Sequence, residues 1–199
     1  MRSTLCEGRT RAGFLAIQGQ LCYDNRIEGG LISMSGSEAK VMVICGGGSG
    51  KTSAAIGEGI KALADGRTVT WIRFLKGRAN ESLMRVLKRL EPEMKAFSFE
   101  TYDGVFTELS EEKKQEALVE IKNGIGFARK VMATESCDLL ILDELLGLTN
   151  LGLLPVKELK QLIEARPSGM ALVITGRVFP EELKENVDCV SCIESRFPD

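Results

Sequence analysis

The chain has 199 residues, of which 44% are hydrophobic and 27% charged, a composition typical of one globular domain rather than of a disordered chain. The formal net charge of −2, from 26 Lys and Arg against 28 Asp and Glu, gives no general basic field, so we expect no nucleic-acid partner. Histidine is absent, which excludes Ser-His-Asp catalysis, Cys-His nucleophile pairs and His-ligated metal sites.

The beginning of the chain differs from the remainder. Residues 1–39 contain scattered glycines without a sustained hydrophobic period, and Ser35-Gly36-Ser37 resembles a linker. We therefore predict an N-terminal extension over residues 1–39, flexible or with a helix around 14–21 as one option, followed by one domain over residues 40–199. No apolar run approaches the ~18–20 residues of a membrane span, so we expect no membrane partner.

From residue 40 onward, strand and helix patterns alternate. Short apolar runs predict buried strands over residues 41–45, 68–75, 94–99, 139–142, 170–175 and 189–193. Helical spacing of apolar residues predicts helices over residues 52–63, 81–90, 111–133, 155–165 and 180–186. The alternation predicts an α/β fold with a mainly parallel five- to six-stranded sheet and helices on both faces. The basic cluster Arg85, Lys88 and Arg89 is flanked by glutamates, which is typical of a solvated helix face.

The six cysteines are scattered through a chain of this size, which favours the reducing cytoplasm over a disulfide framework. Cys189 and Cys192 form a single C-x-x-C pattern. Because neither a histidine nor a second such pair accompanies them, we interpret both as buried structural thiols rather than metal ligands.

The strongest motif is Gly46-Gly47-Gly48-Ser49-Gly50-Lys51-Thr52-Ser53, between a predicted strand and a predicted helix. This context is typical of a loop that binds phosphate. Glycines let backbone N–H groups approach the phosphates, and the helix N-terminus adds positive potential. Lys51 would face the distal phosphates and the Thr52 hydroxyl would bind Mg²⁺. A glycine-rich turn with Gly-Lys-Thr by chance is the less favoured reading.

Two further motifs follow predicted strands. Asp143 and Glu144 end an apolar strand, as expected for the acidic partner of a phosphate-binding loop, and either carboxylate could hold Mg²⁺. An acid that caps the next helix is the alternative.

Thr175-Gly176-Arg177 places an arginine at the carboxyl edge of the sheet, where ligands bind in open α/β folds. An exposed turn arginine is the alternative there.

These motifs together resemble the P-loop ATP:corrinoid adenosyltransferases over residues 41 to 193. The pieces that match the family pattern, in chain order, are Gly46 to Ser53, Phe74-Leu75-Lys76-Gly77, Gly104-Val105-Phe106-Thr107, Asp143-Glu144, Gly152-Leu153-Leu154, Ala165-Arg166-Pro167, Thr175 to Arg177 and Pro180 to Leu183. The resemblance implies a P-loop NTPase-like fold. It also implies transfer of the 5′-deoxyadenosyl group of ATP to the cobalt(I) of a reduced corrinoid, with triphosphate as the leaving group.

The resemblance also implies roles for particular residues. Catalytic roles fall to Lys51, Glu144 and Arg177, and metal binding to Thr52, Asp143 and Glu144. Nucleotide or corrinoid contacts fall to Gly46, Gly47, Gly48, Ser49, Gly50, Lys51, Thr52, Ser53 and Phe106. Besides ATP, Mg²⁺ and the corrinoid, the reaction needs an electron donor that reduces cobalt, and a homodimer is one assembly to consider.

Two alternatives stay open on the sequence alone. Another P-loop ATPase or kinase would use the same loop and acidic strand end. A non-catalytic relative that binds ATP or corrinoid is the other, because Glu108, Leu146 and Gly147 stand where the family usually has other residues. The family's chains usually continue into a basic, His-containing tail, whereas the given sequence ends at Asp199, after Arg196-Phe197-Pro198.

Overall fold

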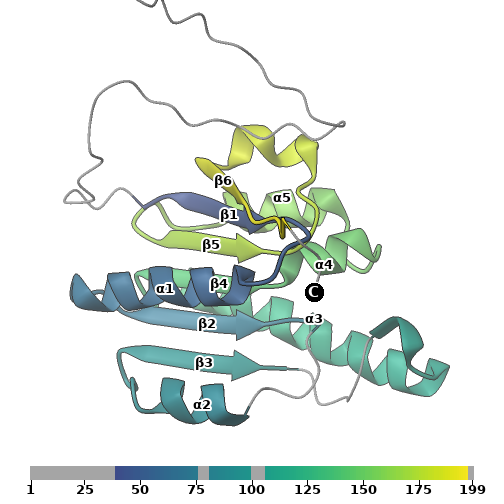
Figure 1. Cartoon of the computed structure of the whole chain (residues 1–199), viewed down its shortest axis with the longest axis horizontal. Coiled ribbons are helices and arrows are strands. Elements are labelled where there is room, and N and C mark those ends of the chain that lie inside the picture. The colour runs from purple at the N-terminus through teal and green to yellow at the C-terminus, as the bar shows by residue number, and fades with distance from the viewer. Residues whose placement is uncertain (1–38, 76–80, 100–105, 197–199) are drawn as a thin grey trace, which may run out of the picture. The chain divides into compact units, whose positions relative to one another are not determined.

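A six-stranded parallel sheet forms the centre of the fold (Figure 1). The computed structural model describes residues 39–75, 81–99 and 106–196, so nearly all of the expected N-terminal extension lies outside the described residues. The strands are β1 (Val41–Cys45), β2 (Val69–Arg73), β3 (Met94–Ser98), β4 (Leu139–Asp143), β5 (Ala171–Thr175) and β6 (Cys189–Cys192). Their order is β3-β2-β4-β5-β1-β6, and every neighbouring pair is parallel, which confirms the predicted fold class.

Helices connect the strands and cover the sheet. They are α1 (Lys51–Ala64), α2 (Glu81–Lys88), α3 (Glu111–Ala133), α4 (Leu145–Asn150) and α5 (Val156–Glu164), with 3₁₀ turns η1 (Phe106–Glu108) and η2 (Glu181–Asn186). The long helix α3 begins after Ser110, whose hydroxyl accepts a hydrogen bond from the Lys113 backbone N–H. Two differences from prediction stand out: α4 was not predicted, and the helix expected over residues 180–186 is the 3₁₀ turn η2.

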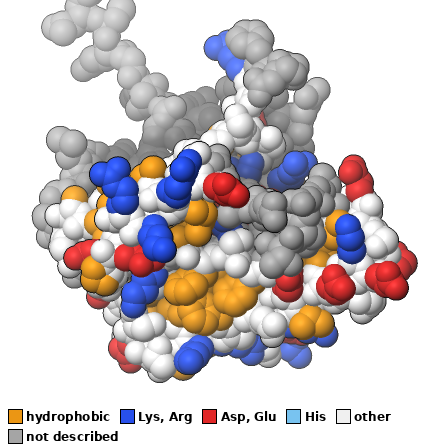
Figure 2. Space-filling model, turned by 90° about the horizontal axis from the view of Figure 1, so that it is seen from below, with side chains coloured by type: hydrophobic (Ala, Val, Ile, Leu, Met, Phe, Trp, Pro, Cys, Tyr) orange, Lys and Arg blue, Asp and Glu red, His pale blue; other side chains and the backbone are white. Residues whose placement is uncertain are grey.

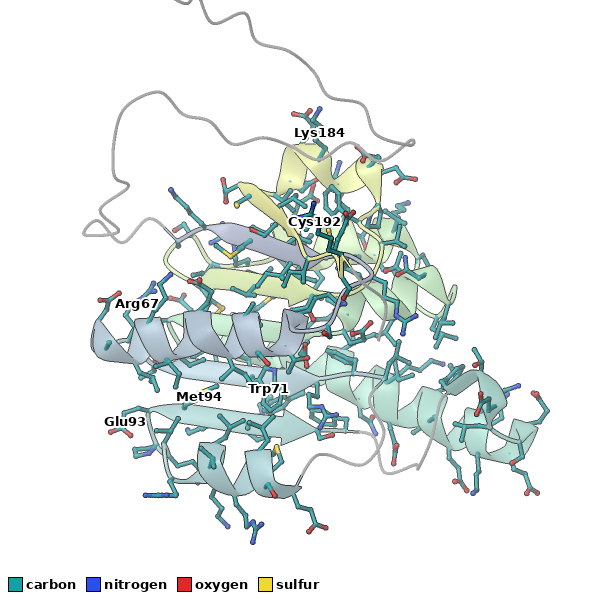
Figure 3. The ribbon with its side chains drawn as sticks, viewed as in Figure 1. Arg67, Trp71, Glu93, Met94, Lys184 and Cys192 are labelled. Carbon is teal, nitrogen blue, oxygen red and sulfur yellow. The ribbon has the colours of Figure 1, made fainter. Side chains whose placement is uncertain are left out.

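The hydrophobic core lies on both faces of the sheet. On one face, Ala55 and Ala62 of α1 and Leu87 of α2 pack against the strands, with Trp71 and Met94 fully buried among them (Figure 3). The other face is covered by α3, α4 and α5, whose leucines, isoleucines and alanines pack against β1, β2, β4 and β5. The predicted helices on both faces are therefore confirmed.

At the amino edge of the sheet, the residues that immediately precede β2 and β4 are joined by hydrogen bonds. Asp138 Oδ2 accepts hydrogen bonds from the Thr68 backbone N–H (2.7 Å) and the Thr68 hydroxyl (2.8 Å). These bonds lower the pKa of Asp138 below its ordinary value. The neighbouring Cys137 is buried, and burial raises the pKa of its thiol, which makes it a poor nucleophile.

The described surface carries charges of both signs. Arg85, Lys88 and Arg89 are exposed on and just after α2, which confirms the solvated helix face expected there. Seen from the side of α2 and β3, Lys and Arg side chains are interspersed with Asp and Glu around an apolar area (Figure 2). None of the described helices combines the length and apolar character that crossing a bilayer requires.

The interpretation of Cys189 and Cys192 as buried thiols was wrong. Cys189 is only half-buried and Cys192 is exposed. The reason is the sheet order, which places β6 at an edge. Within residues 39–75, 81–99 and 106–196, no three His, Cys, Asp or Glu side chains gather closely enough to hold a metal ion.

Candidate nucleotide site

The glycine-rich motif forms the connection between β1 and α1 at the carboxyl edge of the sheet. Residues 46–52 are called the phosphate loop below. Gly46 and Gly50 have φ angles of 112° and 103°, a left-handed conformation that side chains rarely adopt, which explains glycine at both positions. Gly50 immediately precedes α1, so Lys51 and Thr52 open the helix. The predicted strand–loop–helix context of the motif is confirmed.

The phosphate loop is held from both sides by backbone hydrogen bonds. Gly46 N–H donates to the Arg177 carbonyl oxygen (2.9 Å), just past β5, and Gly48 N–H donates to the Ile193 carbonyl oxygen (2.9 Å), just past β6. Because these two N–H groups have protein acceptors, they shape the loop in this structure and do not point at a phosphate. The N–H groups left for phosphate are therefore those in the rest of the loop and the first turn of α1.

Lys51 folds back over the phosphate loop. Its Nζ donates to the carbonyl oxygens of Gly46 (2.8 Å) and Gly48 (2.6 Å). The ammonium group has three donors, so one remains for another acceptor. The positive charge of Lys51 therefore lies against the carbonyl oxygens of the phosphate loop.

Thr52 and Asp143 meet although they are 91 positions apart. The Thr52 hydroxyl lies 3.1 Å from both carboxylate oxygens of Asp143, at the end of β4. The Asp143 side chain is fully buried, and its Oδ1 also accepts a 2.7 Å hydrogen bond from the Thr175 hydroxyl. The loop motif and the acidic strand end predicted from sequence are therefore in direct contact.

Glu144 occupies the sharp turn between β4 and α4. Its φ of 64° is left-handed, and its backbone N–H donates to the Thr175 hydroxyl (2.8 Å). Close packing follows the turn: a Cβ added at Gly147 would lie 3.2 Å from the Glu144 side chain and 2.7 Å from the Leu75 side chain. The half-buried side chain of Glu144 therefore lies close to the backbone of Gly147 in α4.

A row of polar residues crosses the sheet beside this site and was missed by sequence reasoning. Ser98 of β3, Arg73 of β2 and Asp143 of β4 are successive partners in the strand register, so they point to the same face. Arg73 is only 7% exposed, and its guanidinium carbon lies 5.9 Å from the centre of the Trp71 ring. The signal was present in the sequence, because a cation inside an apolar strand is unusual.

The remaining predicted residues lie in three different environments. Arg177 and Ser53 are exposed near the phosphate loop. Phe106 is 8% exposed and packs in the hydrophobic core on the α3 side of the sheet, so it does not join the loop residues. Arg166 is structural: its guanidinium donates to the carbonyl oxygens of Pro167 and Met170, which closes the turn into β5.

A parallel sheet whose first strand runs into a glycine loop, opposite a buried aspartate, defines a P-loop nucleotide-binding protein. The particular family follows from comparison with known proteins. The family model described as ATP:corrinoid adenosyltransferase BtuR/CobO/CobP matches residues 37–196, and the chain belongs to this family.

Curated relatives agree with this assignment. The corrinoid adenosyltransferase of Escherichia coli K12 is 29% identical over 76% of this chain and 74% of its own length. Corrinoid adenosyltransferase CobA of Salmonella typhimurium is 25% identical over 87% and 86%, and the Pseudomonas aeruginosa enzyme is 27% identical over 76% and 72%. Among solved structures, the flagellar accessory protein FlaH of Methanocaldococcus jannaschii covers 78% of this chain and 71% of its own, with 15% identity and a TM-score of 0.49.

The chain is therefore a transferase of the corrinoid adenosyltransferase family, with ATP and a corrinoid as its substrates. The comparisons favour neither alternative considered from the sequence, the kinase or ATPase and the non-catalytic relative.

Proposed function

We propose that this chain binds ATP at the phosphate loop and transfers its 5′-deoxyadenosyl group to the cobalt(I) of a reduced corrinoid. The observation that carries the proposal is the contact between the Thr52 hydroxyl and both oxygens of the buried Asp143. The contact brings the phosphate loop next to the end of β4, and we propose that these two parts of the chain together bind the triphosphate. The absence of histidine agrees with this reaction, because the chemistry needs no general base.

The proposed step balances without a proton transfer. An electron pair of cobalt(I) forms the bond to the 5′ carbon, and the bond between that carbon and its oxygen breaks. The electron pair of the broken bond leaves on triphosphate, while cobalt passes formally from +1 to +3. Catalysis then consists of positioning the two substrates and stabilising negative charge as it grows on the leaving oxygen.

The residues around the loop suit that task. Lys51 would exchange its bonds to the loop carbonyls for bonds to phosphate oxygens, which its ammonium group can do without leaving the loop. Arg177 lies just past β5, and its carbonyl oxygen accepts the Gly46 N–H. Its backbone is therefore in contact with the phosphate loop. We propose that its guanidinium binds two oxygens of the departing triphosphate, a geometry that its planar fork favours.

Mg²⁺ fits the donors at this end of the sheet. The Thr52 hydroxyl and the Asp143 carboxylate are hard oxygen donors, and Mg²⁺ usually takes one or two protein oxygens together with substrate phosphates. We propose that these two residues bind the ion and that Glu144, in the adjacent turn, contributes to metal binding. When bound, the ion would neutralise charge on the phosphate oxygens. Thr175 would keep the Asp143 carboxylate in position.

Several further features are proposed from family membership. The corrinoid must be reduced before the reaction, so an electron donor is an expected partner, and a homodimer is the proposed assembly.

Free thiols among the described residues suit a cytoplasmic location. Residues 1–39 are proposed to form an extension to the catalytic domain of residues 40–199. Phe106 would contact the corrinoid only after it has left its buried position in the core.

The proposal is tested with the full chain, ATP, Mg²⁺ and chemically reduced cobalamin under anaerobic conditions. The visible spectrum of the corrinoid reports adenosylation directly. The wild-type chain is expected to form adenosylcobalamin, and Lys51→Ala is expected to form it far more slowly. Arg129→Ala is a matched control, because Arg129 is exposed near the end of α3, which leads to the opposite edge of the sheet. Equal rates for wild-type and Lys51→Ala would contradict the proposed site.

A further inference from the structure

The chain leaving β6 is attached to the phosphate loop. We call residues 193–196 the exit segment. Ile193 N–H donates to the Cys45 carbonyl oxygen (2.8 Å), and the Ile193 carbonyl oxygen accepts the Gly48 N–H (2.9 Å). Ile193 is therefore bonded to the residue before the loop and to a residue within it. Cys192, which precedes the exit segment, lies at the carboxyl end of β6 (Figure 3).

The exit segment also packs closely against the loop glycines. A Cβ added at Gly46 would lie 2.2 Å from the Ile193 carbonyl oxygen. A Cβ added at Gly48 would lie 2.8 Å from the Glu194 carbonyl carbon and the Ser195 nitrogen. These glycines are thus required for the approach of the exit segment, and the backbone up to Ser195 forms one wall of the loop.

The loop is flanked in the same way on its other side. Strand β1 lies between β5 and β6 in the sheet, and the residues that follow each neighbour accept one N–H of the loop. On the β5 side the acceptor is Arg177 itself. On the β6 side the acceptor is Ile193, and Arg196 follows three residues later, directly after the Ser195 contact. An arginine therefore lies on each flank of the loop.

Both arginines have a free guanidinium within the part of the chain that the structure describes. Arg177 and Arg196 are exposed, and neither side chain forms a hydrogen bond or ion pair with a described residue. By contrast, the charged Lys51 and Asp143 of the site are already engaged with described partners. The two arginines are thus cations at the edge of an anion site with donors available.

We propose that Arg196 is a second arginine of the triphosphate site and binds phosphate oxygens from the β6 flank of the loop, as Arg177 does from the β5 flank. The proposal rests on the proposed function and names a further residue for the same site. Because Gly46 and Gly48 give their N–H groups to the flanking segments, the loop retains fewer backbone donors for a highly charged triphosphate. Guanidinium groups on the same two segments supply the missing donors, in a geometry that fits two anionic oxygens.

The test measures binding to the full chain by calorimetry, with ATP, inorganic triphosphate and adenosine as separate probes. Arg196→Ala is expected to weaken the binding of ATP and of inorganic triphosphate by about tenfold. This is the lower end of the effect expected when a hydrogen bond to a charged group is lost, because the site is exposed. Arg196→Lys keeps the positive charge but loses the planar guanidinium group. Its affinity for ATP and inorganic triphosphate is expected to lie between those of Arg196→Ala and wild type. Binding of adenosine should not change in either variant.

Two controls separate this proposal from the proposed function. Lys51→Ala tests the site itself, and Arg129→Ala removes the same charge at the opposite edge of the sheet. Loss of triphosphate binding in Arg196→Ala but not in Arg129→Ala supports the proposal. Affinities within about twofold of wild type in Arg196→Ala, while Lys51→Ala loses binding, would overturn the role of Arg196 and leave the site standing. Equal losses in Arg129→Ala and Arg196→Ala would also overturn it. Unchanged binding in Lys51→Ala would overturn the site and this proposal together.

Discussion

The Thr175 hydroxyl orients both acidic residues of the site. It donates a 2.7 Å hydrogen bond to Asp143 Oδ1 and accepts a 2.8 Å hydrogen bond from the Glu144 backbone N–H. Thr175 is fully buried at the end of β5, the strand between the loop strand β1 and the acidic strand β4. One side chain on the intervening strand thus holds the turn that carries Asp143 and Glu144.

Replacement of Thr175 by valine is expected to impair both stability and nucleotide binding. The change keeps the shape of the side chain but leaves Asp143 Oδ1 and the Glu144 N–H without this partner. Loss of a buried hydrogen-bond partner costs about 1–3 kcal/mol in the free energy of unfolding. Thr175→Ser keeps the hydroxyl and serves as the control. Denaturant unfolding and ATP titration of both variants test this expectation. Equal free energies of unfolding and equal ATP affinities for Thr175→Val and Thr175→Ser would contradict it.

Neighbouring glycines of the phosphate loop should respond differently to alanine. At Gly48 a Cβ would overlap backbone atoms of Glu194 and Ser195 at 2.8 Å, and backbone cannot rotate away as a side chain can. At Gly47 nothing lies within 4 Å of the added Cβ. We expect Gly48→Ala to lower the free energy of unfolding by about 1–3 kcal/mol, as overpacking does, and Gly47→Ala to have a much smaller effect. Comparable melting temperatures for the two variants would refute the described contact with residues after β6.

Arg177 is expected to act on the leaving group more than on bound ATP. If its contact strengthens as charge grows on the departing oxygen, Arg177→Ala should lower kcat more than it raises KM for ATP. The loss of one oxyanion-type contact corresponds to about a hundredfold in rate. Steady-state kinetics of Arg177→Ala and Arg177→Lys with saturating reduced corrinoid decide the matter. A kcat within about twofold of wild type in both variants would remove Arg177 from the mechanism.

Asp138 should make stability depend on pH in the acid range only. The Thr68 hydrogen bonds lower the pKa of Asp138, so its carboxylate is favoured in the folded chain. A lowered folded-state pKa contributes stability above the unfolded-state value, and this contribution is lost as pH falls through the folded-state value, below about 4. Because Asp138 is exposed, the effect should be modest. Melting temperatures of wild type and Asp138→Asn should differ at neutral pH and converge as the pH falls below the pKa of Asp138 in the unfolded chain. A difference that stays constant with pH would contradict this expectation.

Much of the fold could be predicted because buried parallel strands have a simple sequence signal. The predicted and observed bounds of β1 are the same, since an apolar run ends abruptly in glycines. Helix α4 was missed for a physical reason. Its residues are buried nearly all round, so it lacks the amphipathic period of a surface helix, and it begins directly after a strand.

The motifs of the candidate site could be found in the sequence, but the contacts between them could not. Lys51, Thr52 and Asp143 were identified from the sequence, and the structure brings Thr52 and Asp143 into contact. The roles of Thr175 and Ile193 depend on which strands are neighbours, and local sequence does not specify strand order. The exposure of Cys192 was mispredicted for the same reason, because an apolar strand at the edge of a sheet looks like a central one in sequence.

The central claim is that ATP is cleaved at its 5′ carbon, and phosphorus NMR of the reaction products tests it most directly. The full chain is incubated with ATP, Mg²⁺ and excess chemically reduced corrinoid, and the phosphorus products are compared with the amount of adenosylated corrinoid. We predict one inorganic triphosphate for each adenosylated corrinoid, and no product when the corrinoid is omitted. Formation of ADP and phosphate, with the corrinoid unchanged, would contradict the account.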